Sequence, residues 1–153
     1  MVRIITPDDN TYIIKKNEFV IFLGGTIENG LSKNWQEDYI RVISELCDRF
    51  QKDIVICNPR REKFHIDEIE KQIQWELNHL DRADIVLMNL LSHSASPISL
   101  MELGAYKEKI ICLCKKNFYR YLNVYLTCQH HNIKFTNNEN KFKKFISDII
   151  KKI

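Results

Sequence analysis

The stretch SHSASPISLMELGAY, residues 92–106, follows the apolar run IVLM at residues 85–88. The apolar run is typical of a buried strand. Ser96 is a favourable helix N-cap, and Pro97 suits the first position of a helix. The sequence therefore predicts a central strand that leads through a short loop into a helix beginning at Pro97.

The predicted helix carries an unusual carboxylate, Glu102, with apolar residues on either side of it. A buried charge is costly unless something pairs with it. Gly104 follows two positions later, and a glycine inside a helix usually has a packing or access reason. We interpret this pair as a carboxylate at the carboxyl end of a parallel sheet, beside a glycine that lets a ligand approach. The alternative is a surface glutamate that forms an ion pair with Lys107 or Lys109.

A second unusual stretch is GGTIENG, residues 24–30, which follows the apolar run FVIFL at residues 19–23. The apolar run predicts a central strand. Three of the chain's four glycines lie in the loop after it. This concentration favours close approach of the backbone to a ligand, and the alternative is a tight turn. The candidate binding residues of the loop are Gly24, Gly25 and Thr26.

The rest of the chain alternates between strand-like and helix-like segments. Asp84 opens the strand that contains residues 85–88, and further strands are predicted at residues 53–57, 110–114 and 133–135. Ser32 can cap the first of the predicted helices. These helices cover residues 34–50, 66–82, 118–129 and 141–153. The alternation predicts an α/β fold with a mainly parallel sheet and helices on both faces, in one domain that spans residues 1–153.

The amino-terminal residues suggest a small separate element. Residues 2–6 and 11–15 are strand-like and flank the turn-forming residues 7–10. Two short strands joined by a turn of this kind predict a β-hairpin.

Polar motifs follow three of the predicted strands. In a parallel sheet the carboxyl ends of the strands lie at one edge, where ligands bind. The three motifs are the glycine loop, NPRR at residues 58–61, and the stretch 92–102. Arg60 and Arg61 directly follow a strand and suit an anion, and the alternative is a solvated loop.

The composition is that of an ordinary globular protein, with 44% hydrophobic and 28% charged residues in a chain of 153. The net charge of +3 is too small to indicate binding to a nucleic acid polymer. No signal peptide and no membrane span are expected, since no apolar run approaches the roughly 18 residues of a membrane span. The five cysteines form no CxxC pair, which predicts reduced core cysteines in a cytoplasmic protein.

Motifs for common cofactors are absent from the sequence. It contains neither GxGxxG nor GxxxxGK[ST], so neither a dinucleotide-binding fingerprint nor a P-loop is predicted. The five histidines are scattered, and no spacing of cysteine and histidine suits zinc. No cofactor and no metal are expected.

Four stretches together resemble the nucleoside 2-deoxyribosyltransferase-like superfamily, which also contains deoxynucleoside monophosphate N-glycosidases. They are FLGGTIE at residues 22–28, NPRR at 58–61, QWEL at 74–77 leading to Asp84, and SPISLMELG at 96–104. The resemblance covers roughly residues 20–113 and implies a flavodoxin-like, three-layer α/β/α fold. It also implies cleavage of an N-glycosidic bond through a glutamate nucleophile.

The resemblance implies roles for individual residues. Glu102 falls on the nucleophile, and Glu76 falls near a carboxylate that contacts the sugar or helps the base leave. Asp84 matches an acidic residue that shapes the site. Ser96 matches a phosphate-binding serine of the monophosphate-cleaving branch. The other candidate substrate-binding residues at this edge are Asn58, Ser99 and Gly104.

Phe22 departs from the family pattern, because many members have at this position a tyrosine whose hydroxyl touches the nucleophile. Phenylalanine cannot donate that hydrogen bond, so either the nucleophile is tuned differently or the activity has drifted. One hypothesis is an enzyme that cleaves or exchanges the base of a nucleoside or nucleotide, which the intact stretch 96–104 favours. The others are a non-catalytic module that binds or senses a nucleotide, which Phe22 favours, and an NAD-type glycohydrolase.

The substrate and the oligomeric state are further expectations. Ser96 and Ser99 at the start of the predicted helix, with Arg60 and Arg61 nearby, favour a 5′-monophosphate over a free nucleoside. The resemblance implies a homo-oligomer, because family members complete each pocket with a neighbouring subunit. An aromatic-rich stretch suits such an interface, unless it packs in the monomer core. Its residues are Phe118, Tyr119, Tyr121, Tyr125 and Leu126.

Overall fold

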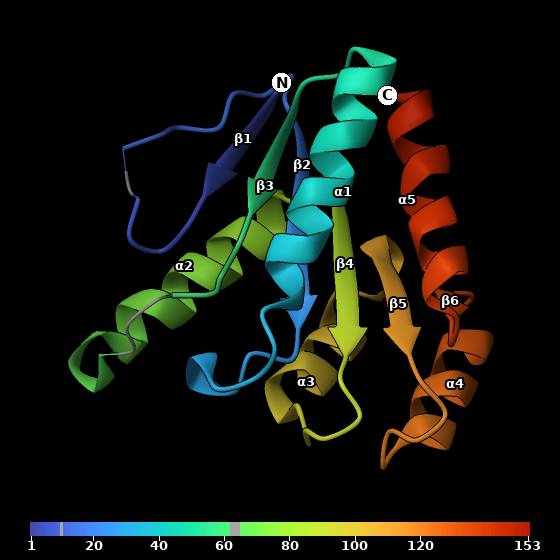
Figure 1. Ribbon diagram of the computed structural model, residues 1–153. Coiled ribbons are helices and arrows are strands. Elements are labelled where there is room, and N and C mark those ends of the chain that lie inside the picture. The colour runs from blue at the N-terminus through green and yellow to red at the C-terminus, as the bar shows by residue number, and fades with distance from the viewer. Residues whose placement is uncertain (10, 62–64) are drawn as a thin grey trace.

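The computed structural model describes residues 1–9, 11–61 and 65–153. Its sheet has six strands in the order β1-β3-β2-β4-β5-β6, and every pair is parallel (Figure 1). The strands are β1 (Val2–Ile5), β2 (Phe19–Gly25), β3 (Ile54–Cys57), β4 (Ile85–Leu90), β5 (Ile110–Cys114) and β6 (Lys134–Thr136). Without β1, this is the strand order of a flavodoxin-like, doubly wound fold. The predicted α/β fold is confirmed, with β1 as an added edge strand.

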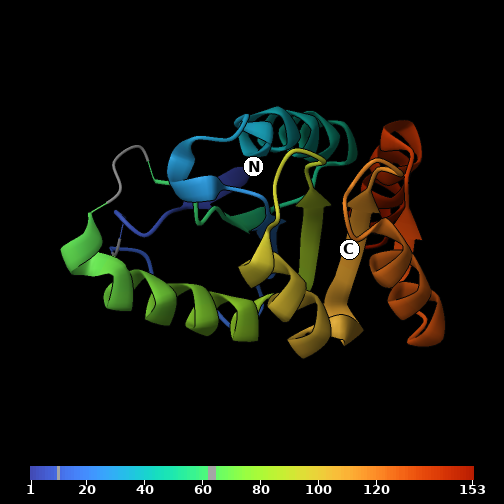
Figure 2. The ribbon, with the colours of Figure 1, turned by 90° about the horizontal axis from the view of Figure 1, so that it is seen from below.

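In the described part of the chain, five α-helices form the outer two layers of the fold. They are α1 (Trp35–Phe50), α2 (Ile69–Arg82), α3 (Pro97–Ala105), α4 (Tyr121–His130) and α5 (Glu139–Lys152). Buried residues of α1 and α5 pack on one face of the sheet, and those of α2, α3 and α4 pack on the other. Figure 2 shows α1 and α2 on opposite sides of the strands. The predicted three-layer α/β/α architecture is therefore confirmed.

The central strands are apolar, apart from the glycines of β2 and Asn89 of β4, because both of their faces are covered. Along β2, Val20 and Phe22 face the layer of α2, α3 and α4, whereas Ile21 and Leu23 face the layer of α1 and α5. Every residue of β3 and of β5 is buried. Continuous apolar runs are typical of parallel strands buried on both faces. The five cysteines are all buried and free, and their predicted place in the core is confirmed.

The predicted amino-terminal β-hairpin is wrong. Residues 2–5 do form a strand, but β1 pairs in parallel with β3, from Val2 beside Ile54 to Ile5 beside Cys57. Residues 11–15 form no strand. Tyr12 and Ile14 instead pack on the core, and Asn10 of the predicted turn lies outside the described residues. The chain gains more by extending the buried sheet at β3 than by pairing two exposed segments with each other, since an isolated hairpin is only marginally stable.

The predicted cap of the first helix is also wrong. Asn34, not Ser32, caps α1, because its Oδ1 accepts a hydrogen bond from the Glu37 N–H at 3.3 Å. Ser32 Oγ donates to the Ile27 carbonyl oxygen at 2.8 Å and closes the preceding loop. The other helices begin or end within a few residues of their predicted bounds, and none in the described part of the chain is long and apolar enough to cross a membrane.

Candidate active site

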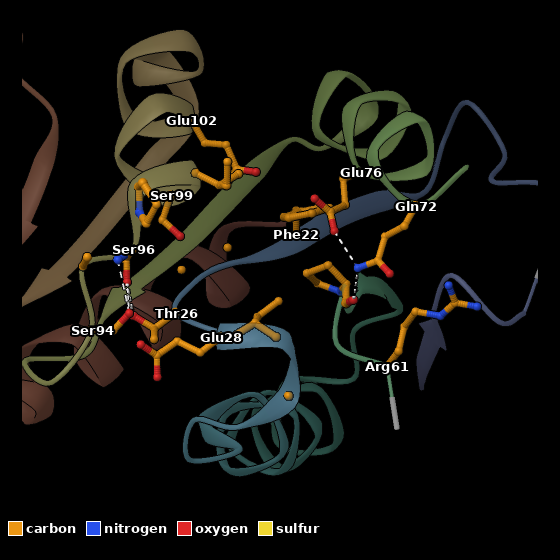
Figure 3. A pocket seen from close by; sticks show the side chains of 18 residues that line it. Phe22, Thr26, Glu28, Arg61, Gln72, Glu76, Ser94, Ser96, Ser99 and Glu102 are labelled. Atoms are coloured by element: carbon orange, nitrogen blue, oxygen red, sulfur yellow. Dashed lines mark hydrogen bonds between the residues drawn. The ribbon is translucent and has the colours of Figure 1, made fainter. Parts of the chain in front are cut away.

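A cavity of about 330 Å³ lies at the carboxyl end of β2, between α2 and α3 (Figure 3). Pockets of a few hundred Å³ suit one small organic molecule. Its lining comes from the end of β2 and the loop after it, the loop after β3, α2, and the segment that leads into α3. The glycine loop and the stretch around Ser96 therefore meet at the edge of the sheet where the sequence predicts a site.

Two carboxylates face each other across this cavity. Glu102 extends from α3 and Glu76 from α2, and Figure 3 shows the two side chains pointing toward one another. Burial, and then the charge of Glu76, raises the pKa of Glu102 from 4.5 to about 7. Burial also raises the pKa of Glu76, and a hydrogen bond from Gln72 opposes that rise. Perturbed carboxyl groups in a cavity are typical of active sites.

Glu102 has no hydrogen-bond or ion-pair partner among the residues that the structure describes. Glu102 does not form the surface ion pair with Lys109 that the sequence offers as an alternative. Lys109 Nζ donates instead to three backbone carbonyl oxygens at the carboxyl end of α2. These belong to Leu80, Asp81 and Ala83, at 2.8, 3.0 and 2.9 Å. The Glu102 carboxylate is half-buried and open to the cavity, so a ligand can reach it.

Gln72 holds Glu76 in place. Gln72 lies one turn before Glu76 on α2, and its Nε2 donates to Glu76 Oε1 at 2.9 Å. The same nitrogen lies 3.4 Å from the Pro59 carbonyl oxygen, which ties α2 to the loop after β3. The Gln72 Oε1 is buried and has no hydrogen-bond partner within the described ranges. It is therefore an acceptor that a ligand could satisfy.

Three buried hydroxyls line the other end of the cavity. Thr26 Oγ1 and Ser96 Oγ are 2.6 Å apart, and Ser96 Oγ is 3.1 Å from Ser94 Oγ. Thr26 Oγ1 accepts the Leu91 N–H at 2.9 Å, and Ser94 Oγ accepts the Ser96 N–H at 3.1 Å. Ser96 occupies the N-cap position of α3, but its side chain makes no cap bond and joins this network instead. The network fixes the loop before α3 against the end of β2.

Gly25 is required by the close approach of β2 to β4. Its φ is +121°, and a Cβ built there would lie 2.3 Å from the Asn89 carbonyl oxygen. The next residue, Thr26, donates its N–H to that same carbonyl at 3.0 Å. The Thr26 carbonyl in turn accepts the Trp35 indole N–H at 2.9 Å. The glycine therefore brings Thr26 into position between β4, α1 and the loop before α3.

The cavity contains most of the predicted site residues. Those that line it are Phe22, Gly24, Gly25, Thr26, Arg61, Glu76, Ser96, Ser99 and Glu102. Phe22 is 1% exposed and packs beside Trp75 of α2, with ring centroids 6.3 Å apart. Its ring forms an apolar wall next to the two carboxylates and offers them no hydroxyl.

Asp84 does not lie in the cavity. It precedes β4, so it sits at the amino end of the sheet, whereas the cavity is at the carboxyl end. Its Oδ2 accepts the Val20 N–H at 2.7 Å, and its N–H donates to the Val20 carbonyl oxygen at 2.9 Å. A strand of six residues separates it from the site, which is roughly 20 Å at the usual rise. Its role is to join the starts of β2 and β4.

The predicted anion-binding arginines are engaged elsewhere. Arg60 is outside the cavity lining, and its guanidinium donates to the carbonyl oxygens of Gly30 and Ser32 at 2.8 and 2.6 Å. Arg61 does line the cavity, but its Nη2 is 2.5 Å from Asp8 and 2.7 Å from Glu68. Arg60 therefore fastens the loop before α1, and Arg61 is already paired with two carboxylates.

Two other predicted residues are also outside the cavity. Asn58 Oδ1 accepts the Arg60 N–H at 3.1 Å and shapes the loop after β3. Gly104 lies on the exposed side of α3, where a Cβ would meet nothing within 4 Å. Gly104 faces α4 and not the cavity. The prediction that Gly104 lets a ligand approach Glu102 is therefore wrong.

Sequence reasoning missed several lining residues. Gln72 could have been found from its spacing, since it lies one helical turn before Glu76. Ser94 belongs to the stretch that organises the site, but only the fold shows that it joins Ser96. The remaining lining residues lie within the stretches 24–30, 58–61 and 92–102, but no feature of the sequence marked them as ligand contacts: Ile27, Glu28, Gly30, Pro59, Ala95, Pro97 and Ile98.

The fold and the cavity together define an α/β protein that presents two interacting carboxylates, a glycine loop and a set of hydroxyls at the carboxyl edge of a parallel sheet. Residues 18–118, more than half of the chain, match the family model described as nucleoside 2-deoxyribosyltransferase like. The chain therefore belongs to this family, and the matched range includes the whole cavity. A search of curated proteins found no match for the chain. Within the described residues, no group of three or more histidine, cysteine and acidic side chains is arranged to hold a metal ion.

Proposed function

We propose that this protein cleaves or exchanges the N-glycosidic bond of a (deoxy)nucleoside or nucleoside 5′-monophosphate, with Glu102 as the nucleophile. The observation that carries the proposal is the pair of half-buried carboxylates, Glu102 and Glu76, that face each other across one small cavity. Family membership supports the same class of substrate. A nucleophile and an acid on opposite sides of a bond are what glycosidic cleavage requires.

In the first step, a carboxylate oxygen of Glu102 forms a bond to C1′ while the bond from C1′ to the base nitrogen breaks. The transition state resembles an oxocarbenium ion, which the nearby negative charge stabilises. The bonding electron pair leaves with the base. Glu76 gives its proton to the departing base, because burial keeps that carboxyl protonated to a higher pH than usual through its raised pKa.

In the second step, the glycosyl ester on Glu102 is attacked at C1′ by water or by a second base. Glu76, now ionised, accepts the proton that the attacking molecule loses. The bond from C1′ to Glu102 breaks, and its electron pair returns to the carboxylate. Water gives hydrolysis and a second base gives exchange. Two successive inversions at C1′ retain the configuration in both cases.

The test is a panel of nucleosides, their 5′-monophosphates and NAD, each incubated with and without a second free base. Chromatography would detect release of free base, appearance of an exchanged nucleoside, or no change. Base release or exchange that depends on Glu102 supports the proposal. Absence of any reaction across the panel would reject it.

The second candidate function is a non-catalytic module that binds a nucleoside or nucleotide. Phe22 favours it, because its ring leaves the Glu102 carboxylate without the hydroxyl donor that the resemblance leads one to expect. The same panel separates the two functions when binding is followed by calorimetry. Tight binding of one compound without any turnover would favour the binding module.

We also propose that the protein is a homo-oligomer that associates through α3 and α4. Large apolar side chains are exposed on these helices, and Tyr119, two residues before α4, is exposed as well. They are Ile98, Met101, Tyr119, Leu122, Tyr125 and Leu126. Phe118, from the predicted aromatic stretch, is 3% exposed and belongs to the monomer core. Ile98 also lines the cavity, so a neighbouring subunit on this surface would lie next to the site.

A further inference from the structure

Resting on the proposed function, we propose that Glu28 makes this site select unphosphorylated nucleosides over nucleoside 5′-monophosphates. Glu28 lines the same cavity as Ser94 and Ser96. Its Oε2 is 3.6 Å from Nε2 of His93, the residue directly before Ser94. Figure 3 shows the Glu28 side chain directed toward Ser94 and Thr26. A full negative charge therefore stands beside the hydroxyls where the sequence favours a phosphate.

The backbone around Glu28 is fixed, so this carboxylate cannot simply move away with its loop. The carbonyl of Glu28 accepts the Leu31 N–H at 3.0 Å, and that of Ile27 accepts the Gly30 N–H at 3.1 Å. Arg60 holds the next part of the loop through the carbonyls of Gly30 and Ser32. Glu28 itself has a φ of +51°, which glutamate rarely adopts. Such a conformation persists where the surrounding contacts impose it.

Among the described residues of the cavity lining, no unpaired lysine or arginine offsets this charge for a ligand. Arg61 is the one lysine or arginine among the described residues of the cavity lining, and it is already paired with Asp8 and Glu68. Arg60 donates to backbone carbonyls outside the lining. The lining itself contains the carboxylates of Glu28, Glu76 and Glu102. A dianionic phosphate placed in this cavity would meet like charges on more than one side.

The positive dipole at the N-terminus of α3 does not compensate for the negative charge of Glu28. A helix N-terminus acts as roughly half a positive charge, whereas an ionised glutamate carries a whole negative one. The hydroxyls at this end suit a neutral group equally well. When Ser94 Oγ accepts both the N–H and the O–H of Ser96, its own proton is left to donate to a ligand oxygen. A 5′-hydroxyl of a nucleoside can accept that bond without bringing a charge.

The test measures kcat/KM for 2′-deoxynucleosides and for their 5′-monophosphates at pH 7.5. The wild type should prefer the nucleoside by about tenfold or more, and Glu28→Gln should reduce that preference by roughly tenfold, since a like charge at close range is worth about this much. Glu45→Gln is the matched control, because it removes the same charge from an exposed position on α1. The control should leave the preference unchanged.

Dissociation constants for the same compounds, measured by calorimetry, give a second readout that does not require turnover. Equal or better use of monophosphates by the wild type would overturn the inference while leaving the proposed function standing. A nucleoside preference that Glu28→Gln leaves unchanged would overturn it as well. If no nucleoside or monophosphate either binds or reacts, the proposed function fails and the inference fails with it.

Discussion

Glu102 of α3 and Glu76 of α2 lie on opposite walls of one cavity, and the charge of Glu76 contributes to raising the pKa of Glu102 to about 7. Two carboxylates in this relation do not lose their protons independently. The pair titrates in two macroscopic steps, and between those steps it holds one proton. The raised pKa of Glu102 places much of the shared proton on Glu102, so the reactive arrangement, with Glu102 ionised and Glu76 protonated, is one tautomer of that singly protonated form.

We predict that kcat/KM for the reactive substrate has a bell-shaped dependence on pH, with its falling limb near pH 7. Below the first step both carboxyls are protonated, so no nucleophile is ionised. Above the second step both are ionised, so the departing base receives no proton. The measurement is a profile of kcat/KM from pH 4.5 to 9. A rate that rises through pH 7 and then stays level would show that Glu76 does not act as the acid.

We predict that Glu102→Gln removes activity, with a loss on the order of 10³-fold or more, because the amide cannot form the covalent bond to C1′. Circular dichroism should show an unchanged fold, since the substitution removes a charge and no core volume. The control is Glu45→Gln, an exposed glutamate of α1 outside the cavity, which should retain full activity. A Glu102→Gln protein with most of the wild-type rate would exclude Glu102 as the nucleophile.

The same substitution should stabilise the protein at neutral and higher pH. The pKa of Glu102 is raised in the folded state, so between pH 4.5 and about 7 the folded protein binds more protons than the unfolded chain. The free energy of unfolding of the wild type therefore falls as pH rises through this window. Glu102→Gln avoids the loss and should gain about 1–2 kcal/mol above pH 7, after allowance for partial exposure, and almost nothing at pH 4.5. Urea unfolding at several pH values measures the difference, and a gain that does not depend on pH would contradict this explanation.

Two glycine substitutions should have opposite effects on stability. Gly25→Ala forces a side chain into the Asn89 backbone at a φ of +121°, and we expect a loss of about 2–4 kcal/mol. Gly104→Ala adds a methyl group to an open position on α3 and should gain about 0.5–1 kcal/mol. Thermal unfolding of both variants beside the wild type tests the pair. Equal effects would mean that the approach of β2 to β4 does not depend on Gly25.

Light scattering should give a mass above the 18.3 kDa of one chain at micromolar concentration, as expected if α3 and α4 form an interface. Leu122 is 67% exposed on α4, and Leu122→Lys should shift the protein toward the monomer. Ile13→Lys is the matched control, since Ile13 is 86% exposed and lies far along the chain from these helices. A wild-type protein that is monomeric under these conditions would reject the proposed oligomer.

The parallel sheet could be predicted because its strands are continuous apolar runs and its helices have apolar stripes. The position of β1 in the sheet could not be predicted, because nothing in a strand of four residues indicates which strand it pairs with. Its partner is distant in sequence, since Val2 pairs with Ile54. The nearest turn-forming residues instead indicate a hairpin. Short edge strands obtain their pairing from the sheet that is already formed, and only the fold shows where that sheet has a free edge.

The location of the site could be predicted, but not the role of every residue in it. Motifs that follow strands converge at one edge, which brings Gly25, Ser96 and Glu102 together. The direction of each side chain is not encoded in that rule, so Arg60 and Arg61 look alike in sequence although one fastens a loop and the other pairs with carboxylates. Asp84 shows the limit of resemblance: its position at the start of a strand already places it at the opposite end of the sheet.

Thr26 is bonded to three neighbouring segments at once: to the Asn89 carbonyl through its N–H, to Trp35 through its carbonyl, and to Ser96 through its hydroxyl. The hydroxyl end of the cavity is thus preorganised before any ligand arrives. Binding of a ligand at this end of the cavity therefore costs little free energy for ordering protein side chains. Hydrogen exchange should therefore be slower in the Thr26 segment than at the exposed start of α2.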